Sequence, residues 1–281
     1  MALSDGWPLP AGRLACTLAG GALAAASAGV LNCLWEEGLD GRMQRTSGRA
    51  LPSGRLSSRY AFALAVTLAL AATGLLLAGV NGLAAGLSLL GLCSYVLLYT
   101  VLLKPRTPRT SSSAGWPARF PPGGLGGGHG SAGVGGWWLF SLVMLWTPAH
   151  FWALALLLRE DYRSVGIPML PVVAGPVLTV RAIGHYARAT ALFSLAGIVA
   201  LPAGGLLYGL LVLPFNARLL QLVADLQRDP DDPKRARRLF AWSILYLFGI
   251  CLLLLLSRLP AAELFGRQGS ELLLGALPFL H

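Results

Sequence analysis

Three oxygen-bearing side chains stand where the first long apolar segment of the chain ends. Asn32, Glu36 and Asp40 are spaced i, i+4 and i+8, so a continuous helix places them on one face, about 6 Å apart along its axis. Such an oxygen-rich stripe suits Mg²⁺, which proteins usually hold with one or two carboxylates together with substrate phosphates. An acidic helix end, neutralised by the arginines that follow, explains the spacing equally well.

A second acidic pair, Glu160 and Asp161, follows the apolar segment 137–158. A carboxylate near the centre of a bilayer costs roughly 2.5 kcal/mol or more, so the positions of acids in an apolar chain carry information. An amphipathic turn at the membrane surface is the simpler explanation for this pair. Two acidic clusters at segment boundaries, each beside several arginines, favour a shared metal–diphosphate site instead.

A histidine lies inside the same segment, because His150 precedes Trp152 by two residues. A core histidine with a hydrogen bond in the protein interior is the simpler explanation. A histidine that faces a bound ligand or takes part in catalysis is the alternative.

These side chains must be positioned by membrane-spanning helices. Of the 281 residues, 55% are hydrophobic and only 12% are charged, whereas soluble domains carry about 25% charged residues. Segments long enough to span occupy 14–35, 60–79, 82–103, 137–158 and 239–258, and the longer stretch 189–225, broken near Pro202, predicts a helical hairpin. We expect one all-α, polytopic transmembrane bundle of about seven or eight spans, a single domain over 1–281. The apolar tail 270–281 is too short to span.

The net charge is +10, and most arginines lie between the apolar segments, in 41–59, 104–109, 159–188 and 226–238. Membrane topology requires this distribution, with basic loops on the cytoplasmic side, and it argues against nucleic-acid binding. Loops 104–109 and 159–188 share a side only if a segment crosses between about 110 and 135, where Gly and Pro disfavour a helix. The four cysteines are dispersed and indicate neither a disulfide framework nor a zinc site.

Several blocks of the chain match one known family. They are Asn32 to Asp40 with Met43-Gln44-Arg45-Thr46 and Pro52-Ser53-Gly54-Arg55; Tyr99-Thr100 to Lys104; Trp146-Thr147-Pro148-Ala149-His150-Phe151-Trp152; Asp161-Tyr162 with Gly166-Ile167-Pro168-Met169-Leu170-Pro171; and Leu239-Phe240 with Ser243 and Tyr246. With these blocks the chain resembles the heme O synthase (protoheme IX farnesyltransferase) family of UbiA-type intramembrane prenyltransferases. It departs from the family pattern at Glu36, where the family has Asp, and at Ala149, where the family has Pro. The stretch 110–122 retains little of the family sequence beyond its Phe-Pro-Pro end.

The resemblance implies a helical bundle around a central cavity that opens to the cytoplasmic side of the cell (inner) membrane. It implies that a farnesyl group passes from farnesyl diphosphate to a vinyl group of protoheme IX, giving heme O for heme–copper oxidases. Heme A synthase or oxidase assembly factors are expected partners, beside membrane lipid.

The resemblance also assigns roles to side chains. The diphosphate would be held through Mg²⁺ by the residues of the two acidic motifs, which are Asn32, Glu36, Asp40 and Asp161. Basic side chains would neutralise the remaining phosphate charge, namely Arg45, Arg55, Lys104 and Arg163. Protoheme contacts are expected from His150, Trp152 and Tyr162.

Three alternatives stay open. The first is prenyl transfer to an aromatic acceptor, as in quinone or chlorophyll synthesis. The second is an inactive, truncated relative that binds heme without catalysis, because the family has nine spans and its first helix would precede residue 14. The third is a transporter, although no inverted repeat is apparent.

The small residues Gly21, Ala25 and Gly29 form a row at i, i+4 and i+8 in the first apolar segment. Small residues let helices approach closely in lipid, so the row is expected to pack against a neighbouring helix. If the family's first helix is its neighbour, we expect the row to be exposed and prenyl transfer by this chain to be poor.

Overall fold

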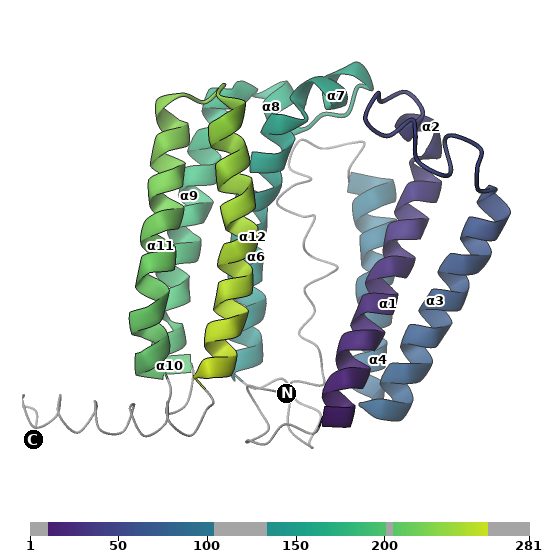
Figure 1. Ribbon diagram of the computed structural model, residues 1–281, viewed down its shortest axis with the longest axis horizontal. Helices are drawn as coiled ribbons and strands as arrows, with labels where there is room; N and C mark the ends of the chain where they lie inside the picture. The colour runs from purple at the N-terminus through teal and green to yellow at the C-terminus, as the bar shows by residue number, and fades with distance from the viewer. Residues whose placement is uncertain (1–10, 104–133, 201–204, 258–281) are drawn as a thin grey trace, which may run out of the picture.

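The computed structural model describes residues 11–103, 134–200 and 205–257 (Figure 1). Lys104, the apolar tail 270–281 and nearly all of the stretch 110–135 lie outside the described residues. Every described element is a helix. In chain order they are α1 (Ala11–Trp35), α2 (Glu37–Asp40), α3 (Ser58–Gly79), α4 (Gly82–Cys93), the π-helix η1 (Ser94–Leu103), α6 (Val134–Leu157), α7 (Arg159–Ser164), α8 (Leu170–Val173), α9 (Gly175–Leu195), α10 (Gly197–Ala200), α11 (Gly205–Arg228) and α12 (Pro233–Leu256).

Six helices in the described part of the chain are long and apolar enough to cross a membrane. They are Ala11–Trp35, Ser58–Gly79, Gly82–Leu102, Gly136–Leu157, Leu207–Arg228 and Pro233–Leu256. The expected all-α membrane architecture is therefore confirmed. The total of about seven or eight spans stays a prediction, because the sequence leaves open whether the stretch 110–135 crosses, and nearly all of that stretch lies outside the described residues.

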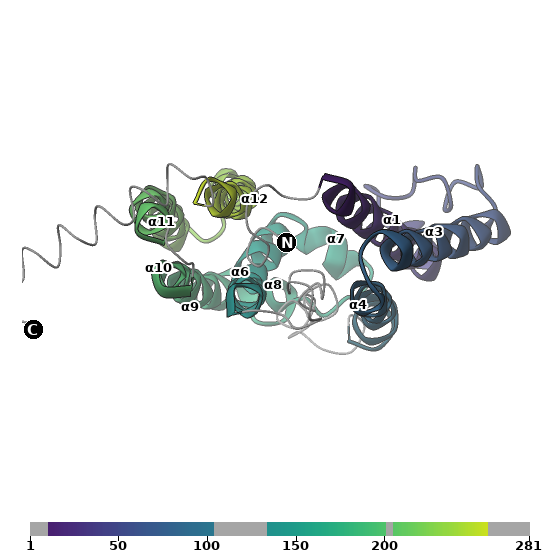
Figure 2. The same ribbon diagram turned by 90° about the horizontal axis from the view of Figure 1, so that it is seen from below.

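The helices form two groups that stand side by side (Figures 1 and 2). The first group contains α1, α3, α4 and η1, and the second contains α6, α9, α10, α11 and α12. At one end of the molecule, α2 and the loop 41–57 lie next to α7 and α8, which belong to the second group (Figure 1). Both acidic motifs lie at this end.

The expected boundary of the helical hairpin is wrong. The charge pattern predicts a basic loop over 159–188, but α9 begins at Gly175. Val180, Ile183 and Ala187 form a buried face in the core shared with α6 and α11, whereas Arg181 and Arg188 are exposed on another face of the helix. The hairpin therefore consists of α9 with α10, followed by α11. A helix whose exposed face is basic has too low a mean hydropathy to be recognised as an apolar segment.

A buried polar network joins α9, α11 and α12. The side-chain nitrogen of Asn216 donates to the carbonyl of Ala191 at 3.1 Å and to the hydroxyl of Ser194 at 2.8 Å. Its oxygen accepts from the Tyr246 hydroxyl at 2.8 Å, and the Tyr208 hydroxyl donates to the Ser194 carbonyl at 3.1 Å. Interhelical hydrogen bonds in membranes contribute about 0.6 to 2 kcal/mol each. The network therefore fixes the packing of three helices that position α6 and α7.

The first group is held together by close contact between α1 and α3. Gly20 of α1 lies directly against the side chain of Leu76 in α3. One and two turns further along, Ala24 and Ser27 are also buried, and the Ser27 hydroxyl donates to the Ala65 carbonyl at 2.8 Å. This contact holds the end of α1, and with it the first acidic motif, in place.

The small-residue row of the sequence lies on another face of α1. Gly21, Ala25 and Gly29 are exposed, and a side-chain carbon added at Gly21 or Gly29 would meet no atom within 4 Å among the surrounding residues. The expectation that this row is exposed is confirmed for the described residues.

Adjacent glycines of α1 should therefore respond in opposite ways to a large side chain. Gly20→Leu forces a collision with Leu76, and overpacking of this kind costs about 1–3 kcal/mol. Gly21→Leu enters open space and should change stability by no more than about 0.5 kcal/mol. Thermal unfolding of the full chain in detergent micelles measures the difference. Equal shifts in the unfolding midpoint for the two variants would contradict this packing of α1 on α3.

Candidate active site

The first acidic motif keeps its helical register across the break between α1 and α2. The backbone N–H of Glu36 donates to the Asn32 carbonyl at 3.0 Å, and that of Asp40 donates to the Glu36 carbonyl at 2.7 Å. The expected i, i+4, i+8 stripe therefore forms. Glu36 and Asp40 are only 7% and 4% exposed, and carboxylates are almost never buried to this extent unless they have polar or charged partners.

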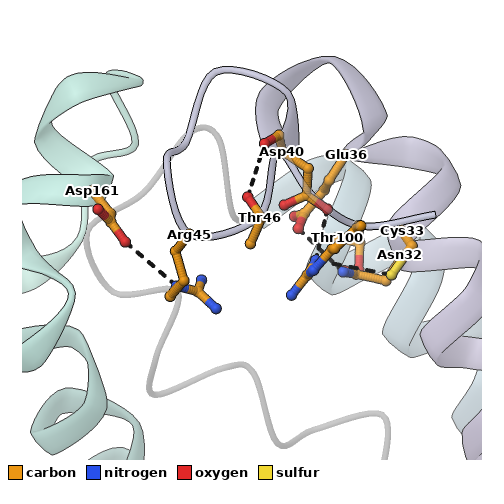
Figure 3. A network of polar contacts seen from close by, with 9 residues as sticks. Asn32, Cys33, Glu36, Asp40, Arg45, Thr46, Thr100 and Asp161 are labelled. Carbon is orange, nitrogen blue, oxygen red and sulfur yellow. Dashed lines mark hydrogen bonds and ion pairs between the residues drawn. The ribbon is translucent and has the colours of Figure 1, made fainter. Parts of the chain in front are cut away.

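Asn32 connects this stripe to the neighbouring π-helix. Its side-chain nitrogen donates to Glu36 Oε2 at 3.1 Å, and its side-chain oxygen accepts from the hydroxyl of Thr100 in η1 at 3.0 Å (Figure 3). Thr100 was part of a recognised sequence block, but nothing in its spacing from Asn32 indicated this contact. It is one of the site residues that sequence reasoning missed.

Asp40 is paired with an arginine that the sequence did not single out. Arg49 Nη1 lies 2.6 Å from Asp40 Oδ2, and the Thr46 hydroxyl donates to the Asp40 carbonyl at 2.9 Å. Both partners come from the loop 41–57, which folds back over the end of α1. The only sequence signal for Arg49 was its place among several arginines in that loop.

The second acidic motif meets the first through an ion pair between the two helix groups. Arg45 Nε lies 3.4 Å from Asp161 Oδ2, across 116 positions of the sequence (Figure 3). Beside this pair, Met43 is buried in a small apolar cluster with Ala155, Ile167 and others from the second group. The structure therefore brings Asp161 to the same end of the molecule as Asn32, Glu36 and Asp40, as the shared-site hypothesis requires.

Tyr162 lies within electrostatic range of both motifs. Burial raises the pKa of its phenol above the ordinary value of 10, the Arg45 guanidinium lowers it, and the carboxylates of Glu36 and Asp161 raise it. The phenol is therefore neutral at physiological pH and keeps its O–H as a hydrogen-bond donor.

Two of the expected phosphate ligands are engaged elsewhere. Arg163 donates to both carboxylate oxygens of Glu160, at 2.8 and 2.9 Å, and not to Asp161. Arg55 donates to the Gly48 carbonyl at 2.6 Å and to the Ser53 hydroxyl at 3.1 Å, within its own loop. Of the other two, Arg45 pairs with Asp161, and Lys104 lies outside the described residues.

His150 and Trp152 make contacts with different neighbours of α6. The His150 ring stacks between Trp146 and Phe240, with centroids 4.4 and 4.8 Å away, and its Nδ1 lies 2.7 Å from the hydroxyl of Ser243 in α12. Trp152 is 5% exposed and packs edge-to-face on a tyrosine of α9. Its indole N–H finds no acceptor in the described structure. Their expected contact with protoheme stays a prediction.

No group of three His, Cys, Asp or Glu side chains in the described residues is arranged to hold a metal ion by itself. The side chains of the two acidic motifs nevertheless offer only oxygen ligands, which Mg²⁺ prefers. This arrangement fits an ion that is shared with the phosphates of a substrate, and it does not fit a metal cage made of protein alone.

Residues 1–261 match the model of a family described as the UbiA prenyltransferase family. The chain is 68% identical over 274 residues to the protoheme IX farnesyltransferase of Prochlorococcus marinus (strain MIT 9313), covering 97% of this chain and 82% of that relative. It is also 68% identical over 274 residues to the protein of the same name from Synechococcus sp. (strain RCC307), covering 97% and 83% of the two chains.

Two solved structures share the fold. One is a UbiA homolog from Archaeoglobus fulgidus bound to DMAPP and Mg²⁺, with a TM-score of 0.63 and 14% identity, covering 86% of this chain and 87% of that chain. The other is a digeranylgeranylglyceryl phosphate synthase, with a TM-score of 0.65 and 15% identity, covering 91% and 89%. At this identity the likeness shows the arrangement of helices alone.

Proposed function

Because the chain belongs to the UbiA prenyltransferase family, we propose that it transfers a farnesyl group from farnesyl diphosphate to a vinyl group of protoheme IX and so produces heme O. The relatives that share about two thirds of its residues are protoheme IX farnesyltransferases. The structural observation that carries the proposal is the ion pair between Arg45 and Asp161. It joins two acidic motifs that are far apart in sequence at one end of the helical bundle.

The diphosphate binds at this end, where the oxygens of Asn32, Glu36, Asp40 and Asp161 are available to Mg²⁺. When bound, the ion supplies positive charge that stabilises the departing diphosphate. The solved relative bound to DMAPP and Mg²⁺ supports this role for the same fold.

The basic side chains complete the phosphate site. Arg45 and Arg49 already lie beside the carboxylates, and a guanidinium can donate two hydrogen bonds to one phosphate group. Arg55 and Arg163 add positive charge when they exchange their present partners for the phosphate, and Lys104 is a further basic residue proposed for this site. The neutral hydroxyl of Tyr162 is a further donor beside the site.

The apolar helices keep water away from the reacting groups. They exclude water from the farnesyl cation that forms when the allylic C–O bond breaks, so that the vinyl carbon of protoheme reacts first. Water then adds to complete the hydroxyethylfarnesyl group. His150, with its ring fixed between two aromatic side chains, is the candidate for protoheme contact in the second helix group.

The same end of the molecule faces the cytoplasm in this proposal. The loop 41–57, α7 and the adjoining ends of α11 and α12 all lie there (Figure 1), and all carry basic residues, with Arg228 at the end of α11 and Lys234 and Arg235 at the start of α12. The positive-inside rule places such loops on the cytoplasmic side of the cell membrane. Heme A synthase or oxidase assembly factors remain proposed partners on that membrane.

Removal of Mg²⁺ should abolish the reaction. Membranes containing the full chain, supplied with farnesyl diphosphate, protoheme IX and Mg²⁺, are expected to yield heme O by chromatography and mass spectrometry. EDTA should reduce the product to the level of membranes without the protein, and excess Mg²⁺ should restore it. Transfer to an aromatic quinone precursor but not to protoheme would overturn the proposed acceptor. Full activity in EDTA would overturn the metal site.

A further inference from the structure

Thr100 differs from the other threonines of the described helices. Six of them donate their hydroxyl to the carbonyl four residues earlier in the same helix: Thr17, Thr67, Thr73, Thr147, Thr179 and Thr190. Thr100 lies in the π-helix η1, and its nearest acceptor within that helix is the Tyr95 carbonyl, five residues earlier, at 3.1 Å. The side-chain oxygen of Asn32 in α1 is at least as close, at 3.0 Å.

The π-helix explains why this hydroxyl reaches a neighbouring helix. A π-turn includes one more residue than an α-turn, so side chains after it are rotated relative to an α-helical path. In an α-helix the hydroxyl of Thr100 would be drawn to the carbonyl four residues earlier, as in the six other threonines. The local distortion of η1 therefore directs Thr100 toward α1. Such distortions in helices are frequent at functional sites.

Two neighbours fix the orientation of the Asn32 amide. Glu36 accepts from its nitrogen and Thr100 donates to its oxygen. The reversed amide would place its oxygen against the Glu36 carboxylate, which can only accept. Thr100 is 1% exposed, so water does not compete for the position of its hydroxyl. An amide oxygen has two lone pairs, and one remains for an ion after Thr100 has used the other.

We propose that Thr100 is a positioning residue that holds the side-chain oxygen of Asn32 in the orientation required by Mg²⁺ and diphosphate. This inference rests on the proposed function, because it gives Asn32 its role as a ligand. Thr100 itself touches neither the ion nor the substrate. Outer-shell groups that orient metal ligands typically change metal affinity or activity 10- to 100-fold when they are removed.

Three variants distinguish the effect of the Thr100 hydroxyl on metal binding from the effect of side-chain shape. Thr100→Val removes the hydroxyl and keeps the volume, and Thr100→Ser keeps the hydroxyl. Thr190→Val is the matched control, because Thr190 is equally buried but donates only within α9. Binding of Mn²⁺ to the full chain, in the presence of an unreactive farnesyl thiodiphosphate, is followed by the electron paramagnetic resonance signal of the free ion.

The dissociation constant for Mn²⁺ should rise about 10-fold in Thr100→Val and stay within about 2-fold of wild type in Thr100→Ser and Thr190→Val. In an Asn32→Ala background, Thr100→Val should add less than about a further 2-fold, because the hydroxyl has lost the group through which it acts. The proposal would be overturned if Thr100→Val had the wild-type dissociation constant for Mn²⁺. It would also be overturned if Thr100→Val weakened Mn²⁺ binding equally in the wild-type and Asn32→Ala backgrounds.

If Thr100→Val does not accumulate in the membrane, Thr100→Ser and Thr100→Ala decide, since they differ only in the hydroxyl. Equal Mn²⁺ constants for this pair would also overturn the positioning role. Failure of the wild-type chain to bind Mn²⁺ with the thiodiphosphate would overturn the proposed metal site and this inference together. If the wild-type protein binds Mn²⁺ and Thr100→Val binds it equally well, the proposed function stands and only the positioning role of Thr100 is refuted.

Discussion

Asp40→Asn is expected to abolish farnesyl transfer while the protein still inserts and folds. The substitution removes a negative charge and almost no volume from a residue that is 4% exposed and lies beside the proposed diphosphate. Loss of one such charge at the reacting group should reduce turnover at least about 100-fold. Stability should change by only about 1 kcal/mol, because the partner Arg49 is 41% exposed and can be hydrated when it is unpaired.

Glu37→Gln is the matched control for this prediction. Glu37 is only three residues from Asp40, but its carboxylate accepts from the Ser58 hydroxyl at 3.0 Å, at the start of α3, and bonds to no other site residue in the part of the chain that the structure describes. Heme O production by membranes with equal amounts of each variant should fall to background for Asp40→Asn and stay within about 3-fold of wild type for Glu37→Gln. Retained turnover in Asp40→Asn would refute the role of this carboxylate.

Asp161→Asn is expected to have an effect of the same size, although Asp161 lies on the other helix group. Its ion pair with Arg45 is partly exposed, with side chains 30% and 46% accessible, so the pair contributes no more than about 1 kcal/mol to stability. A role limited to this pair would therefore leave activity nearly unchanged. A role in holding the metal–diphosphate predicts a loss of at least about 100-fold.

The neighbouring Glu160 provides the comparison. Its carboxylate pairs with Arg163 and Arg159 and is 69% exposed. Glu160→Gln should leave turnover within about 3-fold of wild type, because exposed ion pairs contribute little. Initial rates with varied farnesyl diphosphate, measured for both variants, distinguish the two carboxylates. Equal losses in Asp161→Asn and Glu160→Gln would show that α7 acts as a charged surface and not through Asp161 specifically.

The sequence by itself determined the local features of this protein. Long apolar segments cross membranes because the backbone must satisfy its hydrogen bonds within the segment, so most spanning helices could be placed without tertiary information. Helical periodicity placed Asn32, Glu36 and Asp40 on one face, because it depends only on positions a few residues apart. The position of Glu160 and Asp161 at a segment boundary, beside several arginines, favoured a site shared with this motif, and the family resemblance selected Asp161 from the pair.

The tertiary structure decided which side chains share the site. Arg45 and Arg49 come from the same loop as Arg55, and only the path of that loop over the end of α1 assigns two of them to Asp161 and Asp40. Thr100 reaches Asn32 because η1 departs from α-helical geometry, and α9 is a helix despite its basic face because its other face is buried. Each of these outcomes depends on contacts between segments that are distant in the chain. Local periodicity and hydropathy hold no information about such contacts, because their energies arise only when the helices pack.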